Sequence, residues 1–100
     1  MNQPDTNKLN GARDKALLTF LYNTGARVQE AIDLDVSDLN MENPQQVVLT
    51  GKGEKQRIIP LYPETIKAIK TYLDFRKKAG FQSDTLFLNA KGERITRFGI

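Results

Sequence analysis

The sequence predicts an α+β fold that is mainly helical and carries a small antiparallel β-hairpin. Apolar residues recur at helical spacing in two stretches, over residues 11–24 and 63–78. Between them, two short β-rich runs flank a glycine-punctuated turn at residues 51–55. The chain has 100 residues, 39% of them hydrophobic and 27% charged, which fits one domain or a part of one.

The N-terminal half is expected to hold two helices. Residues 1–9 are interpreted as a flexible lead-in, and Asn10 is a candidate N-cap for a helix over residues 11–24. Gly25 should end this helix, because glycine adopts the left-handed conformation common after a helix C-terminus. A second, shorter helix fits residues 26–34.

The C-terminal half is expected to begin with the hairpin. Its strands are residues 47–50 and 57–61, and a helix over residues 63–78 follows, with proline at its first position. Residues 86–88 are expected to form another short strand, and residues 90–93 a second turn. The three tyrosines lie within helical patterns and are expected to pack: Tyr22, Tyr62 and Tyr72.

Composition excludes several kinds of chemistry. Histidine and cysteine are both absent, so these residues contain no histidine base, no Ser-His-Asp triad, no disulfide and no thiolate metal site. The formal charge of +3 is uneven, with −3 over residues 1–50 and +6 over residues 51–100. A basic half favours a polyanionic partner, although a solvated lysine-rich surface explains it equally well.

Two segments remain as candidates for phosphate chemistry. The first, residues 22–31 (YNTGARVQEA), places Arg27 just after the predicted helix break and Glu30 one turn later. Arginine carries a planar, permanently charged fork that matches phosphate oxygens, and helix N-termini also favour anions. Glu30 could hold the guanidinium in position, but the pair could also be an ordinary surface ion pair.

The second segment is residues 51–61 (GKGEKQRIIPL). Lys52 lies between two glycines at the expected hairpin tip, where it could reach into a groove. Lys55 and Arg57 add positive charge for flanking phosphates. A solvated hairpin tip is the alternative interpretation, because lysine and glycine are common in turns.

Together, in this order and at this spacing, the two segments resemble the catalytic domain of the tyrosine recombinases, the phage-integrase family. The resemblance runs from about residue 13 to residue 100 and implies a partial tyrosine-recombinase catalytic domain over residues 10–100. It implies that Arg27 binds the scissile phosphate and that Lys52 is a general acid toward the leaving 5′ oxygen. Glu30 would support Arg27. Basic and polar residues matched to DNA contact are Lys55, Arg57, Thr96 and Arg97.

The resemblance also implies a reaction and its partners. The family cleaves double-stranded DNA through a 3′-phosphotyrosyl intermediate and rejoins it, with neither metal nor other cofactor, and such recombinases assemble as tetramers on two DNA sites. The family's His-x-x-Arg box and nucleophilic tyrosine have no match here. We therefore expect an inactive, monomeric fragment of a cytoplasmic enzyme, with no membrane association.

Two other function classes remain open from the sequence. A small non-catalytic DNA-binding module could use the same basic hairpin. A structural or interaction fragment would have no nucleic-acid role at all. The DNA-binding module is the main alternative, and the interaction fragment is the third function class.

Overall fold

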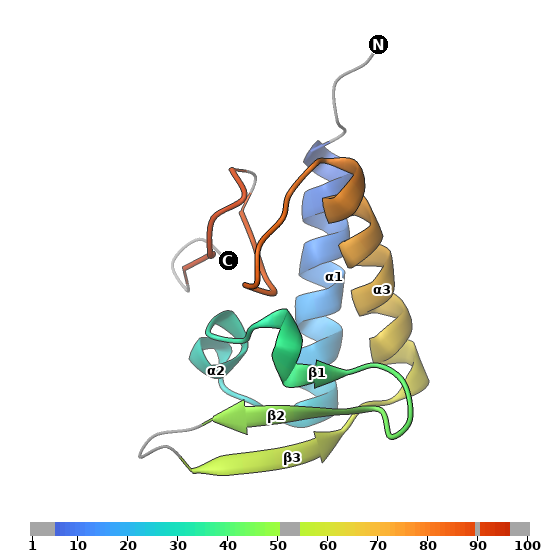
Figure 1. Ribbon diagram of the computed structural model, residues 1–100, viewed down its shortest axis with the longest axis vertical. Helices are drawn as coiled ribbons and strands as arrows, with labels where there is room; N and C mark the ends of the chain where they lie inside the picture. The colour runs from blue at the N-terminus through green and yellow to red at the C-terminus, as the bar shows by residue number, and fades with distance from the viewer. Residues whose placement is uncertain (1–5, 51–54, 90, 97–100) are drawn as a thin grey trace.

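The computed structural model describes residues 6–50, 55–89 and 91–96. Two long helices, α1 (Thr6–Thr24) and α3 (Pro63–Lys78), lie side by side, and a three-stranded sheet lies across one end of the pair (Figure 1). The remaining elements are short: α2 (Val28–Ile32), the 3-10 turn η1 (Val36–Asp38), β1 (Leu39–Asn40), β2 (Gln46–Thr50) and β3 (Gln56–Pro60). The α+β class predicted from the sequence is confirmed.

The hydrophobic core lies between the two long helices and the segment that follows α3. Phe20 of α1 is fully buried and meets the ring of Phe87 edge-on, with the ring centroids 6.3 Å apart. Phe87 also stacks on Tyr72 of α3 at 5.9 Å. These aromatic contacts join α1 to α3 and to the 86–88 segment that follows α3, so the core fixes the three segments relative to one another.

The predicted hairpin is confirmed as an antiparallel pair of β2 and β3. Val47 pairs with Ile59 and Leu49 pairs with Arg57. Val47 and Leu49 are fully buried, so one face of β2 covers the core. The short strand β1, which the sequence did not indicate, pairs with the other edge of β2. The expected tip of the hairpin, residues 51–54, lies outside the described residues.

Both N-terminal helices differ in length from the prediction. Helix α1 begins at Thr6, so residues 6–9 are helical and Asn10 lies inside the helix instead of capping it. Leu9 is buried against the core, and this contact stabilises an additional turn. Gly25 ends α1 as predicted, with a φ of 66°. Helix α2 covers only Val28–Ile32 of the expected residues 26–34.

The expected strand over residues 86–88 does not form. The three side chains are buried, but the backbone makes only isolated bridges, Asp35 with Thr85 and Leu88 with Arg94. Side chains of α3 replace the missing strand partner. The Tyr72 hydroxyl donates to the Leu86 carbonyl at 2.8 Å and accepts the Leu88 N–H at 2.9 Å.

Only one of the three tyrosines packs as expected. Tyr72 is buried, whereas Tyr22 and Tyr62 are 96% and 60% exposed. Tyr22 is two residues past Phe20, a rotation of about 200° that places it on the opposite side of α1 from the core. Tyr62 precedes α3 as its N-cap. Within the described residues, no helix has both the length and the apolar character to cross a membrane.

Candidate nucleic-acid interface

Arg27 lies at the N-cap of α2, immediately after the loop that Gly25 begins. Its backbone is extended and its side chain is exposed. Within the described part of the chain, no carboxylate lies within ion-pair distance of the Arg27 guanidinium. The guanidinium is therefore available to an anion at the N-terminal end of the helix, where the backbone N–H groups also favour negative charge.

Glu30 joins α2 to the hairpin. Its Oε1 atom accepts the backbone N–H of Arg27 at 2.9 Å, and its Oε2 atom accepts Nη2 of Arg57 on β3 at 2.8 Å. The backbone hydrogen bond from Arg27 is the largest single cause that lowers the pKa of Glu30. Burial opposes it, and the hydrogen bond and charge of Arg57 and the charge of Arg27 lower the pKa further. An ionised Glu30 thus fixes the N-terminus of α2 against β3.

This arrangement differs from the pair expected from the sequence. Both interpretations of the sequence paired Glu30 with the side chain of Arg27, but Glu30 holds the backbone N–H of Arg27 and the guanidinium of Arg57. Arg57 is 51% exposed on its side chain and has other N–H donors that the ion pair with Glu30 does not use. Arg57 therefore keeps the capacity to contact a second anion.

The space between α2 and the hairpin is a cleft of about 640 Å³. Three of its lining residues are basic and were predicted from the sequence: Arg27, Lys55 and Arg57. The cleft also contains Asp33, whose carboxylate accepts the side-chain N–H of Gln29 at 2.9 Å. Two arginines and a lysine around an open cleft form a surface that can bind a phosphodiester backbone.

The other residues singled out in the sequence lie elsewhere. Thr96 is exposed and does not line the cleft, although its neighbour Ile95 is buried in the core. Lys52 and Arg97 lie outside the described residues. The structure thus brings together Arg27, Glu30, Lys55 and Arg57, and these four residues define the candidate interface.

No role was predicted for Asn23, although it lies in the first candidate segment, residues 22–31. The Asn23 side chain donates to the Pro60 carbonyl at 3.1 Å and accepts the Tyr62 N–H at 2.9 Å and the Thr65 hydroxyl at 2.8 Å. These three bonds fasten the end of α1 to the junction between β3 and α3. A polar residue beside an apolar helical stripe was the only signal in the sequence, and it does not identify partners 37 to 42 residues away.

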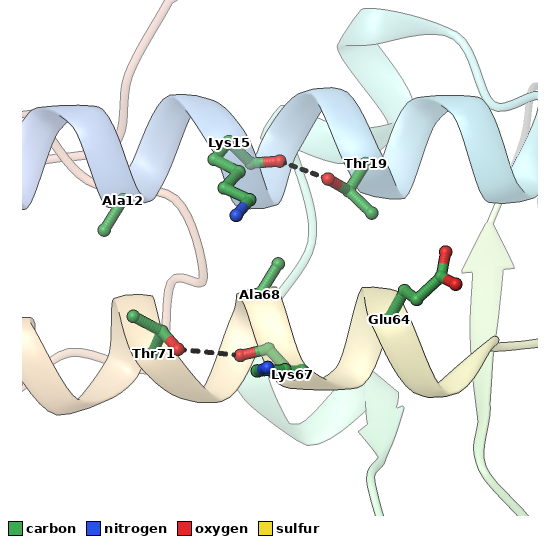
Figure 2. Close-up of a pocket in the computed structure, with 7 residues that line it drawn as sticks. All are labelled: Ala12, Lys15, Thr19, Glu64, Lys67, Ala68 and Thr71. Carbon is green, nitrogen blue, oxygen red and sulfur yellow. Dashed lines mark hydrogen bonds between the residues drawn. The ribbon is translucent and has the colours of Figure 1, made fainter.

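A second hollow, of about 400 Å³, lies between α1 and α3 and contains none of the predicted site residues (Figure 2). Lys15 and Lys67 line it from opposite helices. The hydroxyls of Thr19 and Thr71 donate to the carbonyls of these same lysines, at 2.6 and 3.0 Å, and so are already engaged. Within the described residues, no cluster of three or more carboxylates could hold a metal ion.

Comparison with known proteins decides the family. The model of the phage integrase family matches residues 1–100. The chain belongs to this family. Tyrosine recombinase XerC of Pelobacter propionicus is 41% identical over 97 residues, which are 97% of this chain and 32% of that protein. Tyrosine recombinase XerD of Staphylococcus epidermidis is 41% identical over 103 residues, covering all of this chain and 35% of that protein.

Solved structures of similar recombinases share the fold of this chain. The crystal structure of XerA recombinase matches with a TM-score of 0.71 at 27% identity, over 96% of this chain and 35% of that one. The XerH site-specific recombinase bound to difH substrate, in a pre-cleavage complex, matches with a TM-score of 0.70 at 28% identity, over 98% and 32%. The chain therefore spans about a third of the length of the relatives it matches.

Proposed function

We propose that these residues are part of a tyrosine-type site-specific recombinase that cuts and rejoins double-stranded DNA through a 3′-phosphotyrosyl intermediate. The observation that carries the proposal is the placement of Arg27. Its guanidinium has no carboxylate partner among the described residues, while its backbone is fixed by Glu30 at the edge of a basic cleft. The named recombinase relatives at 41% identity support the same reaction.

Arg27 would bind the phosphate at which the strand is cut. Attack on this phosphate concentrates negative charge on its equatorial oxygens, and a guanidinium held in place beforehand stabilises that charge without reorganising. Lys55 and Arg57 would contact flanking phosphates from the other wall of the cleft. The ion pair between Glu30 and Arg57 would hold α2 and β3, the two sides of the cleft, at a fixed distance.

Lys52 would supply the proton to the leaving 5′ oxygen, and Thr96 and Arg97 would contact the DNA backbone. The tyrosine nucleophile would come from another part of the recombinase. Tyr72 is buried with its hydroxyl bonded at both sides, and neither Tyr22 nor Tyr62 lines the basic cleft. We further propose that the enzyme acts in the cytoplasm as a tetramer on two DNA sites. These 100 residues alone would be monomeric and inactive.

The test is substitution of Arg27 in a full-length recombinase that contains this chain. Arg27→Ala should reduce single-turnover strand cleavage by about 10²–10³-fold, the range for removal of one donor to a developing oxyanion. Lys70→Ala is the matched control, because it removes a positive charge from the exposed surface of α3 outside the cleft. DNA affinity is measured in parallel for both variants.

The outcomes separate the two functional classes. Cleavage that survives Arg27→Ala would show that Arg27 does not act on the reacting phosphate. If the unsubstituted protein binds DNA but never cleaves it, the chain belongs to a non-catalytic DNA-binding module. In that case Arg27→Ala would weaken affinity and reduce its salt dependence by about one charge.

A further inference from the structure

We propose that Arg94 is a positioning residue, which holds the C-terminal end of α2 and thereby sets the placement of Arg27 at the opposite end. The proposal rests on the proposed function for Arg27. Arg94 lies 62 residues after Ile32, the last residue of α2, and no motif in the sequence connects them.

The Arg94 guanidinium is directed at protein acceptors. Its Nη1 atom donates to the Ile32 carbonyl at 2.6 Å. Its Nη2 atom donates to the Thr85 hydroxyl at 3.2 Å and lies 3.5 Å from Oδ1 of Asp35. The shortest of these contacts is a charge-assisted bond to a carbonyl at the end of a helix, where backbone acceptors lack partners within the helix and a positive charge is favourable.

Helix α2 needs such external support because it has only five residues. A helix of this length, about 7 Å, is not stable by itself, since its few internal bonds do not offset the cost of forming the first turn. Its N-terminal end is fixed by the bonds from Glu30 to Arg27 and Arg57. Arg94 supplies the corresponding fixed point at the C-terminal end.

Arg94 can serve as a fixed point because its own backbone is tied to the core. Leu88 and Arg94 form an isolated antiparallel bridge, and the next residue, Ile95, donates its N–H to the Phe87 carbonyl at 3.3 Å. Ile95 is itself buried. The Asn89 side chain accepts the N–H groups of Lys91 and Glu93, at 2.8 and 3.0 Å, which orders the turn before Arg94.

The bonds of Arg94 predict a kinetic signature that differs from that of a DNA contact. If Arg94 acts only through α2, its loss should slow cleavage at saturating DNA and leave DNA affinity nearly unchanged. A displacement of about 1 Å at a reacting group is enough to cost about 100-fold in rate. A phosphate contact would instead weaken binding and change its salt dependence.

The experiment compares Arg94→Ala, Arg94→Lys and Lys91→Ala in a full-length recombinase that contains this chain. Lys91→Ala removes the same charge from the same turn, and its side chain makes none of the bonds of Arg94. Amide hydrogen exchange follows α2 through the N–H groups of Ala31 and Asp33, which bond to the carbonyls of Arg27 and Gln29. Single-turnover cleavage and the DNA dissociation constant are measured on the same samples.

We expect Arg94→Ala to accelerate exchange at Ala31 and Asp33 by about tenfold or more, while amides in the centres of α1 and α3 stay protected. Cleavage should fall by about 10- to 100-fold. Arg94→Lys should recover part of both losses, because lysine keeps one charged donor for the Ile32 carbonyl. Lys91→Ala should change neither quantity.

Three results would contradict the proposal. Unchanged exchange in α2 would show that Arg94 does not order this helix. Faster exchange in α2 with full cleavage would show that its order does not matter to the reaction. A loss of DNA affinity equal to the loss of rate would make Arg94 a DNA contact. An unsubstituted protein that cleaves no DNA would overturn the proposed function, and the exchange data would still decide whether Arg94 orders α2.

Discussion

The pair of long helices and the charged edge formed by α2 and the hairpin are held together in different ways. Between α1 and α3 the contacts are apolar and numerous, and Phe20, Ile69 and Tyr72 are almost completely buried. At the charged edge, single side chains make bonds across long stretches of sequence. Glu30 reaches Arg57 over 27 residues, and Arg94 reaches Ile32 over 62.

The difference indicates that fold stability and site geometry depend on separate parts of the molecule. Apolar burial is proportional to area and tolerates small shifts, so it stabilises the domain without fixing a particular charged group. Hydrogen bonds to charged groups require short distances and good angles, so they fix position while contributing less to the total stability. Substitutions in the helix pair should therefore change the free energy of unfolding more than substitutions at the charged edge.

The largest effect is expected in the helix pair. Phe20→Ala should lower the free energy of unfolding by about 3–5 kcal/mol, because it removes a fully buried ring and leaves a cavity beside Phe87. Leu18→Ala, on the same helix but 64% exposed, is the control and should change stability by less than about 0.5 kcal/mol. Denaturant titration of both variants measures the difference. Similar losses in the two variants would mean that Phe20 does not anchor the core.

The sequence predicted the apolar helix pair and the hairpin, but not most of the polar contacts at the charged edge. The helices and the hairpin were predicted because their apolar residues recur at fixed spacing, and packing follows that spacing. The position of Tyr22 was mispredicted because its helical pattern was read as wider than the face that α3 covers. The contacts of Asn23 and Arg94 left no periodic signal, since their partners are backbone and side-chain groups that only the folded chain brings near.

For Arg27 and Glu30, the sequence predicted the position in the fold but not all of the contacts. Their spacing placed both at the start of a helix, and the structure confirms that placement. The partner of Glu30 could not be predicted, because it depends on the approach of β3 to α2, which is a tertiary contact. The sequence therefore indicated which residues form the candidate interface more reliably than it indicated how they are connected.

An intermediate effect is expected where polar bonds enter the core. Tyr72→Phe keeps the ring stacked on Phe87 but leaves the Leu88 N–H without its acceptor, while the Leu86 carbonyl still accepts from Arg76 at 2.7 Å. One orphaned buried donor should cost about 1–3 kcal/mol.

The control for this change is Tyr62→Phe, which removes a hydroxyl from an exposed ring and should be nearly neutral. Thermal unfolding of the two variants measures the comparison. If Tyr72→Phe is also neutral, then the Tyr72 hydroxyl does not help to hold the 86–88 segment, and Tyr72 contributes through the packing of its ring on Phe87.

The smallest effect on stability is expected at the charged edge, and it should depend on pH. Because folding lowers the pKa of Glu30 below its usual 4.5, the ionised carboxylate stabilises the folded state above about pH 4.5. This contribution, about 0.2–1 kcal/mol for a partly exposed pair, is lost as the pH falls through the lowered pKa. The difference in unfolding free energy between the unsubstituted chain and Glu30→Gln, measured from about pH 6 to about pH 3, should shrink in this window.

Arg57→Gln shows which bond of Glu30 is responsible. The backbone N–H of Arg27 is the largest single cause of the lowered pKa of Glu30, so part of the pH dependence should persist when Arg57 is replaced. Its disappearance would mean that the ion pair with β3, and not the bond within α2, governs Glu30. In that case the ion pair between Glu30 and Arg57 would set the position of α2 relative to β3.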